Sequence, residues 1–277
     1  MRYPVPPMFA TVAIAFAAYV VMGFRLVYMA RPPLSFRSSF CGVLVGLAVN
    51  NVLPAKAGEI SKALWLGRSN GISFQKALGI VFMERFFDVN VLALLSLWFL
   101  WFNDGRGTFT ILVASLLLGW TLLAIFYHYP SLTGRFVRLF GRGRLRDFVE
   151  QALSAVLSNM SRGRLIWLAA TSLTGWFFYG LQMHLSVNAV AGLNLPWDAV
   201  LSVFAFSGLS MLLPSSPGAF GVYEAFMVTA LKRYGVDAEE ALAVALFAHM
   251  TQFIPVTLAG GLLFAAFPEK AKVEKKE

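Results

Sequence analysis

The sequence predicts an all-α polytopic membrane protein, with about five full transmembrane helices and two re-entrant helical hairpins in an inverted-repeat arrangement. Of its 277 residues, 58% are hydrophobic and only 13% are charged, whereas about a quarter of the residues of a soluble domain are charged. The charges are grouped between long apolar runs, and two shorter apolar runs end at a proline. This composition excludes a soluble globular domain and places any function within the membrane.

Five stretches are long enough to cross a bilayer, because a helix needs about 20 mostly apolar residues to span the hydrocarbon core. These expected crossings are residues 8–29, 75–102, 108–129, 165–190 and 241–267. The first stretch is flanked by Arg25 and Arg31, which stop transfer. We therefore expect it to be retained rather than cleaved as a signal peptide.

Two shorter apolar runs, 38–53 and 199–213, are each cut off by a proline, Pro54 and Pro214. A small-residue loop and a second short helix follow each run, at 58–68 and 221–234. We read both as re-entrant hairpins. Each break has the spacing Leu-Pro-x-x-x-Gly, at 53–58 and 213–218, and the two halves run crossing, hairpin, crossing. An inverted repeat of this kind is typical of secondary transporters.

Basic residues concentrate in the connection 130–164, which contains seven arginines, and cytoplasmic loops carry the excess of Lys and Arg. We therefore expect a multi-pass protein of the cell inner (cytoplasmic) membrane, with the N-terminus outside and the C-terminus cytoplasmic. Arg25, Arg31 and Arg37 would also lie on the cytoplasmic side. Residues 145–157 predict an amphipathic surface helix. This charge indicates attraction to anionic lipid headgroups, and no nucleic-acid recognition module accompanies it.

We expect a single transmembrane domain over residues 1–277. Its parts would be a first repeat (8–102, with hairpin 38–68), a spacer helix and basic cytoplasmic loop (108–164), a second repeat (165–267, with hairpin 199–234) and a basic tail (268–277). The one cysteine, Cys41, excludes an intramolecular disulfide, and without a cysteine cluster we expect neither a metal nor a cofactor. Small-residue pairs such as Gly260-Gly261 pack helices within or between chains, so no oligomeric state is expected over another.

Charged residues that cannot reach an interface are informative, because charge inside a bilayer is costly and tends to face a partner or a water-filled cavity. The first such group comprises Lys56, Glu59 and Lys62 of the first hairpin with Glu84, Arg85 and Asp88 of the next crossing. Three positive and three negative charges could form a salt-bridge network that fastens the hairpin to its neighbour. Alternatively, some of these charges could meet a ligand headgroup.

The second polar group lies in the other half of the chain. It comprises Glu224, the nearby Ser215, Ser216, Gly218 and Gly221, and His249 and Gln252 of the last crossing. Glu224 has no evident local partner, and Pro255 is expected to kink the helix that carries His249. A lone histidine on an apolar helix is more often a hydrogen-bonded core residue than a ligand.

The second limb of each hairpin is expected to begin at mid-depth, near Gly58 and Gly221, so that two helix N-termini point into the centre of the protein. Helix N-termini favour anions, and Lys56 and Arg85 would add positive charge beside one of them. Such a cavity suits a phosphate. At membrane depth, a phosphate is most simply the headgroup of a lipid in transit.

Three segments resemble the signature blocks of the lysylphosphatidylglycerol synthase transmembrane region family of flippase-like proteins: NNVLPAKAGEISKALWL (50–66), ALGIVFMERFFDV (77–89) and LLPSSPGAFGVYEA (212–225). The resemblance covers nearly the whole chain. It implies a lipid-translocating membrane protein, with matching positions Pro54, Gly58, Glu59, Glu84, Arg85, Asp88, Pro214, Pro217, Gly218, Gly221 and Glu224. Because the chain ends ten residues past the last expected crossing, we expect no soluble aminoacyl-transferase domain and no synthase activity.

The resemblance implies cargoes such as phospholipids, hopanoids or polyprenyl-linked lipids. The candidate headgroup or cavity residues are Asn51, Pro54, Lys56, Gly58, Glu59, Lys62, Glu84, Arg85, Asp88, Pro214, Ser215, Ser216, Pro217, Gly218, Gly221, Glu224, His249 and Gln252. No catalytic residue and no metal ligand is expected among them.

A flippase-like lipid transporter is therefore the leading hypothesis, and the protein is not expected to be an enzyme. No G-x-x-x-x-G-K-[ST] motif occurs, so transport would be passive, ion-coupled or driven by consumption of the lipid. Glu59, Glu84, Asp88 or Glu224 could carry a proton. One alternative is a lipid-binding scaffold for a partner enzyme. Another is an intramembrane serine hydrolase that uses Ser210, Ser215 or Ser216 with His249, although no G-x-S-x-G elbow frames any of them.

Overall fold

Helices account for the secondary structure of the described residues, 5–54, 56–102, 106–210 and 216–266, in this computed structural model. The predicted all-helical class is confirmed. In chain order the elements are α1 (Val5–Val27), α2 (Phe36–Val52), α3 (Ala57–Asn70), α4 (Phe74–Phe102), α5 (Arg106–His128), α6 (Pro130–Arg138), α7 (Arg144–Leu157), α8 (Arg162–His184), the π-helical η1 (Leu185–Val190), α9 (Trp197–Leu209), the 3₁₀ turn η3 (Pro217–Ala219), α10 (Val222–Lys232) and α11 (Ala238–Ala265).

Each of the five expected crossings is a long helix: α1, α4, α5, α8 and α11. Within the described residues, three helical segments are long and apolar enough to cross a membrane, namely Val5–Val27, Phe109–His128 and Ala238–Ala265. Helix α4 has 29 residues but carries Glu84, Arg85 and Asp88 near its middle. The last residues of the expected second hairpin run (211–213) and of the last crossing (267) lie outside the described residues, as does the basic tail.

The two interrupted runs form pairs of short helices, α2 with α3 and α9 with α10, whose members pack against each other. Helix α2 has 17 residues and α9 has 13, so both are shorter than the about 20 residues that a full crossing needs. The chain reverses between α2 and α3 at Lys56, whose φ of 54° is left-handed. The first break lies where the sequence placed it, because proline ends a helix locally. The second run is also divided into two short helices, while Pro214 itself lies outside the described residues.

Very close backbone contacts join α2 to its neighbours. A Cβ atom on Gly58 of α3 would lie 1.9 Å from the Gly46 carbonyl oxygen of α2. A Cβ atom on Gly260 of α11 would lie 2.1 Å from the Leu44 carbonyl oxygen on the same helix. Only glycine fits at either position, as expected where helices approach closely inside a membrane.

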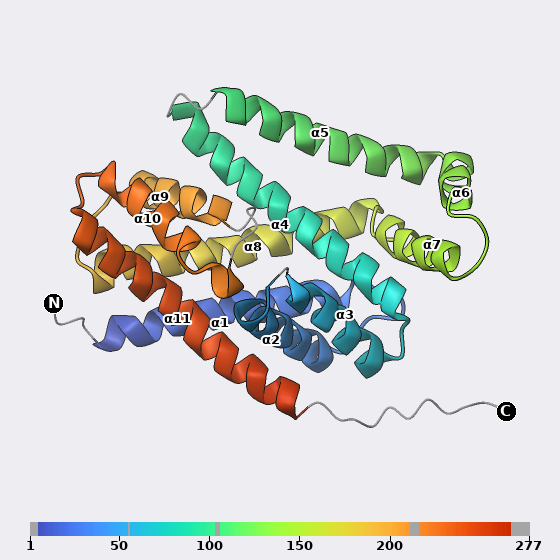
Figure 1. Cartoon of the computed structure of the whole chain (residues 1–277), viewed down its shortest axis with the longest axis horizontal. Coiled ribbons are helices and arrows are strands. Elements are labelled where there is room, and N and C mark those ends of the chain that lie inside the picture. Colours follow the sequence, from blue (N-terminus) through green and yellow to red (C-terminus); the bar gives the residue numbers. More distant parts are fainter. Residues whose placement is uncertain (1–4, 55, 103–105, 211–215, 267–277) are drawn as a thin grey trace.

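The long helices of the two halves run in opposite directions. Figure 1 shows α1 and α8 lying side by side and antiparallel, and α4 and α11 likewise run in opposite senses. Helix α5 lies on the outside of this arrangement, where it contacts α4, α6 and α7. The amphipathic helix expected at 145–157 is present as α7 and packs against α4. Helix α6, within the basic connection, was not predicted.

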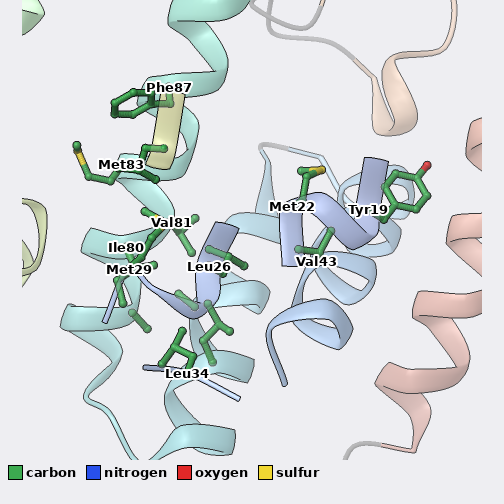
Figure 2. Packing of buried hydrophobic residues seen from close by; sticks show 14 of the residues in the cluster. Tyr19, Met22, Leu26, Met29, Leu34, Val43, Ile80, Val81, Met83 and Phe87 are labelled. Carbon is green, nitrogen blue, oxygen red and sulfur yellow. The ribbon is translucent and has the colours of Figure 1, made fainter. Parts of the chain in front are cut away.

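The main apolar core lies between the first helices of the chain and α4. Figure 2 shows Tyr19 and Met22 of α1, Val43 of α2 and Met83 and Phe87 of α4 among the side chains of this cluster. A second cluster, around Met227 of α10 and Val244 of α11, holds the other helix pair. Each short pair therefore has its own apolar contacts. The polar residues at the tip of a pair, where one short helix ends and the next begins, lie between these two packed regions.

Gly260→Ala should destabilise the protein by about 1–3 kcal/mol, since overpacking a well-filled contact costs this much. The added methyl group would meet the backbone of α2, which cannot move aside as a flexible side chain could. Thermal unfolding in detergent measures the effect. Gly261→Ala is the matched control, because a Cβ atom there has no neighbour within 4 Å. Equal unfolding temperatures for the two variants would show that α2 and α11 do not pack this closely.

Candidate functional site

A cavity of about 510 Å³ lies between the two short helix pairs. Its lining comes from both halves of the chain: α1, α2, α4, α8, α9, α10 and α11 all contribute. The first helix pair contacts the second half of the chain beside the cavity. Asn51 Nδ2 of α2 donates to Thr257 Oγ1 of α11 at 2.7 Å, and α2 also contacts η3.

One end of the cavity is a network of ion pairs. Arg25 donates to Glu84 at 2.8 Å and to Asp88 at 2.6 Å. Lys62 Nζ lies 3.0 Å from Glu84 and 3.8 Å from Glu59. Breaking a pair of this kind leaves an uncompensated buried charge, so the network binds α1, α3 and α4 together.

Arg25 of this network is not a loop charge, although the sequence grouped it with the loop residues Arg31 and Arg37. It is 1% exposed and lies within α1. Its guanidinium also donates to Ser172 Oγ of α8 at 2.8 Å. The partners are 59 to 147 positions away in the chain, so only the tertiary fold identifies them.

Arg85 is the network cation most exposed to the cavity, with 34% of its side chain accessible. It lies 3.3 Å from Glu59 and 3.2 Å from Asp88. Lys56 also lines the cavity, at the tip of the first helix pair. With Arg25 included, the group has four cations and three carboxylates, so it carries one net positive charge rather than the zero expected from the sequence.

Side chains of the protein accept hydrogen bonds from backbone N–H groups at the N-termini of α3 and α10. The Gly58 N–H donates to Asn50 Oδ1 at 2.8 Å, and the Gly221 N–H donates to Glu224 Oε2 at 2.7 Å. These backbone donors are therefore committed to side chains. Positive charge available to a ligand comes mainly from Arg85 and Lys56, and less from the helix ends than the sequence suggested.

The other end of the cavity holds a second polar group. Glu224, buried in α10, lies 2.5 Å from His249 Nδ1 of α11, so the partner that the sequence did not reveal is His249. The imidazole is enclosed by the rings of Phe220, Tyr223 and Phe253, at 4.9, 4.7 and 5.9 Å between centroids. His249 thus combines the expected core packing with a position on the cavity wall.

Two glutamines extend this second group. Gln252 of α11 donates to the buried Gln182 of α8, whose amide donates to Thr251 Oγ1 at 3.1 Å. Gln182 did not figure among the candidate residues. A glutamine on an apolar helix is a weak signal, because amides in membrane helices commonly hydrogen-bond to neighbouring helices.

The structure brings most of the candidate residues to one place. Those that line the cavity are Asn51, Pro54, Lys56, Glu59, Arg85, Asp88, Ser216, Gly218, His249 and Gln252. Lys62, Glu84 and Glu224 lie behind the lining as direct ionic partners of lining residues. Gly58, Pro217 and Gly221 shape the two tips, and Pro214 and Ser215 lie outside the described residues.

The apolar wall of the cavity was not anticipated. It includes Tyr19, Trp176, Tyr179, Phe204 and Phe253. Trp176 Nε1 also donates to Asp88 at 3.3 Å, which joins this wall to the ionic network. The cavity therefore offers an apolar surface next to charged groups, as an amphiphilic ligand requires.

The serines proposed as nucleophiles have other roles where they are described. Ser210 Oγ donates to the Ser207 carbonyl oxygen at 2.5 Å, and Ser216 Oγ to the Phe220 carbonyl oxygen at 2.7 Å. Within the described residues, no group of three His, Cys, Asp or Glu side chains is arranged to hold a metal ion.

Comparison with known sequences places the chain among membrane proteins. The profile of the family described as Lysylphosphatidylglycerol synthase TM region matches residues 2–260. A UPF0104 membrane protein of Methanocaldococcus jannaschii is 26% identical over 228 residues, 78% of this chain and 92% of that protein. A UPF0104 membrane protein of Methanothermobacter thermautotrophicus is 25% identical over 269 residues, 89% of this chain and 79% of that protein.

A phosphatidylglycerol lysyltransferase of Staphylococcus xylosus is 29% identical over 112 residues, which is 39% of this chain but only 13% of the enzyme. No solved structure is similar to the chain. The protein is an integral multi-pass membrane protein, because it has long apolar helices and its relatives are membrane proteins.

Arg25→Gln should lower the free energy of unfolding by about 3–5 kcal/mol, because removing one partner of a buried ion pair leaves Glu84 and Asp88 undercompensated. Arg146→Gln is the matched control: its pair with Glu150 is 4.0 Å long and exposed, and such pairs contribute at most about 1 kcal/mol. Thermal unfolding in detergent compares the two. Similar unfolding temperatures would mean that Arg25 does not hold α1 against α4.

Proposed function

Because this chain belongs to the lysylphosphatidylglycerol synthase transmembrane region family, we propose that it is a flippase-like lipid transporter. It moves a polar or anionic lipid headgroup across the cytoplasmic membrane through the cavity between its two short helix pairs. This movement makes and breaks no covalent bond, so in this proposal the protein is a transporter and not an enzyme.

The observation that carries this proposal is the composition of the cavity. Arg85 and Lys56 supply positive charge at one end, while Tyr19, Trp176 and Phe204 supply an apolar wall. A headgroup phosphate can pair with a guanidinium in bidentate fashion, and acyl chains can lie against aromatic rings. Ionisable residues that line a cavity inside a membrane protein are typical of substrate and ion pathways.

The relatives support a phospholipid as the cargo. One of them is named as a phosphatidylglycerol lysyltransferase, so phosphatidylglycerol and its aminoacylated form are the first headgroups to test. A ligand of this kind carries a phosphate and, when aminoacylated, also an ammonium group. Arg85 would pair with the phosphate, and Glu59 and Asp88 beside it would pair with the ammonium.

We also propose that the short helix pairs are re-entrant and that the two halves form an inverted repeat, in which α4 and α8 cross fully. The packing supports this. In the first half α2 packs on α1, α3 and the long helix α11, and α3 packs on α4. In the second half α9 packs on α8, α10 and the long helix α4, and α10 packs on α11. If α1, α2, α3 and α4 are exchanged with α8, α9, α10 and α11 in that order, each of these contacts maps onto another of them. The opposite directions of α1 and α8, and of α4 and α11, in Figure 1 fit an inversion.

The proposed orientation has the N-terminus outside and the connection containing α6 and α7 in the cytoplasm. Arg135 and Arg138 of α6 and Arg144 and Arg146 of α7 support it, because cytoplasmic segments carry the excess of positive charge. Arg25 no longer counts in this argument, since it is buried.

Transport is tested with phosphatidylcholine vesicles that contain the purified protein and fluorescent phosphatidylglycerol, whose exposure to an external quencher reports transbilayer movement. Arg85→Gln should slow the movement by about tenfold to a hundredfold, since a hydrogen bond to a charged group contributes about 1.5–3 kcal/mol. Lys56→Gln, on the exposed tip, should slow it less, and Arg146→Gln should leave it unchanged.

Unfolding temperatures of the same variants separate loss of transport from loss of folding. If the wild type moved none of phosphatidylglycerol, its aminoacylated form or a polyprenyl phosphate, the transporter proposal would be rejected. If those lipids bound tightly without moving, the protein would instead be a lipid-binding scaffold.

A further inference from the structure

The polar residues of the two cavity ends stand at the same positions of equivalent helices. Arg85 and Asp88 lie as far from the start of α4 as His249 and Gln252 lie from the start of α11. Glu59 of α3 corresponds in the same way to Glu224 of α10. Arg25 of α1 and Gln182 of α8 are matched by their contacts, with Asp88 and with Gln252 respectively.

The contacts between these residues are also repeated. Glu59 pairs with Arg85 at 3.3 Å, and Glu224 pairs with His249 at 2.5 Å. Arg25 donates to Asp88, and the equivalent amides of Gln182 and Gln252 hydrogen-bond to each other. Two separate contacts, each between different helices, thus recur at equivalent positions.

The second copy lacks the permanent positive charges of the first. Gln182 replaces Arg25, His249 replaces Arg85 and Gln252 replaces Asp88. The buried Lys62–Glu84 pair is replaced by Met227 and Ala248, both fully buried. What remains is one carboxylate, Glu224, beside one imidazole, a side chain that can gain or lose a proton. The first end is therefore permanently charged, whereas the second end changes its charge when it binds a proton.

The geometry of the Glu224–His249 contact requires a proton between the two residues, because a carboxylate oxygen and an unprotonated ring nitrogen 2.5 Å apart would repel each other. With Nδ1 protonated and Glu224 ionised, the pair carries one negative charge. A second proton, taken up on Nε2, converts the imidazole to imidazolium and makes the pair neutral.

Other charged and titratable groups face the pair from the surrounding elements. Tyr223 of α10 is in ring contact with His249. The uncharged Ser207 of α9, Asn51 of α2 and Ser216, just before η3, line the same cavity. Around the rest of the cavity lie Arg25 and Tyr19 of α1, Lys56 at the tip before α3, Glu59 of α3, Arg85 and Asp88 of α4, and Tyr179 of α8.

The other three carboxylates beside the cavity are each paired with at least two cations. Glu84 contacts Arg25 and Lys62, Asp88 contacts Arg25 and Arg85, and Glu59 contacts Arg85 and Lys62. Among the described residues, the partners of Glu224 are the His249 imidazole and the Gly221 N–H.

We infer that Glu224 and His249 form a proton-binding site through which one proton accompanies each anionic headgroup across the membrane, an inference that rests on the proposed lipid transport. The physical reason is charge balance in the cavity. Without the proton, the negative pair repels an anionic headgroup held at Arg85. With the proton, the repulsion is removed, so headgroup and proton enter the cavity together and leave on the same side.

Vesicles that contain the protein and fluorescent phosphatidylglycerol test this coupling under an imposed pH gradient, with potassium and valinomycin holding the membrane potential at zero. The wild type should accumulate the lipid in the leaflet facing the more alkaline solution. One proton per lipid allows up to about a tenfold difference between the leaflets for a gradient of about one pH unit. Protein-free vesicles correct for unassisted movement.

Glu224→Gln and His249→Gln should abolish this accumulation, and the glutamine at 224 can still accept the Gly221 N–H. His249→Arg should also abolish it while keeping an ion pair like that of Arg85 with Glu59. The control is His184→Gln, because His184 stacks on Trp197 with 3.8 Å between ring centroids and does not line the cavity.

Each outcome decides between the two proposals. Accumulation that is lost in the three variants and retained in His184→Gln would establish the proton site. Even equilibration of the lipid by the wild type despite the gradient, or accumulation that persists in Glu224→Gln and His249→Gln, would overturn the coupling and leave the transporter proposal intact. If the wild type moved no lipid with or without a gradient, the transporter proposal would fail and the coupling with it.

Discussion

The rest of the site depends on the ion pairs that the guanidinium of Arg25 makes with Glu84 and Asp88. A buried cation in a membrane protein is tolerated only with close partners, and Arg25 finds them on two other helices, at Glu84, Asp88 and Ser172. These contacts hold α1, α4 and α8 in one arrangement. Arg85 shares the carboxylates of Glu84 and Asp88 with Arg25 and is partly exposed towards the cavity. The salt-bridge interpretation of this group is therefore observed, and in the proposed transport the same network presents Arg85 to the headgroup.

The two ends of the cavity have the same layout with different chemistry. In the proposed inverted repeat, the first copy carries the permanent positive charges. The second copy keeps one carboxylate, Glu224, and has His249 and Gln182 where the first copy has arginines. Duplication followed by divergence of this kind would supply a transporter with a substrate site and a coupling site in equivalent positions, so that the cavity combines both in one place.

The close packing of glycines explains how short helices can form the cavity wall. Gly58 lies against the backbone of α2, and Gly260 lies against it on another side. Helix–helix contacts at this distance replace the apolar side-chain packing that a short helix lacks, and Asn50 satisfies the backbone N–H of Gly58. Irregular backbone is tolerated at membrane depth only where protein or water satisfies its polar groups, and here the neighbouring helix provides that partner.

The sequence alone determined the helical class, the long apolar helices, the division of two apolar runs into short helices, and the charged residues that line the cavity other than Arg25, such as Lys56 and Arg85. These features follow from local rules: apolar length, proline geometry and the cost of charge in an apolar run act on neighbouring residues. The tertiary structure decided the burial of Arg25, the pairing of Glu224 with His249 and the role of Gln182. Their partners lie on other helices, 25 to 147 positions away, and the identity of a partner across such a distance depends on how the helices pack rather than on any local pattern.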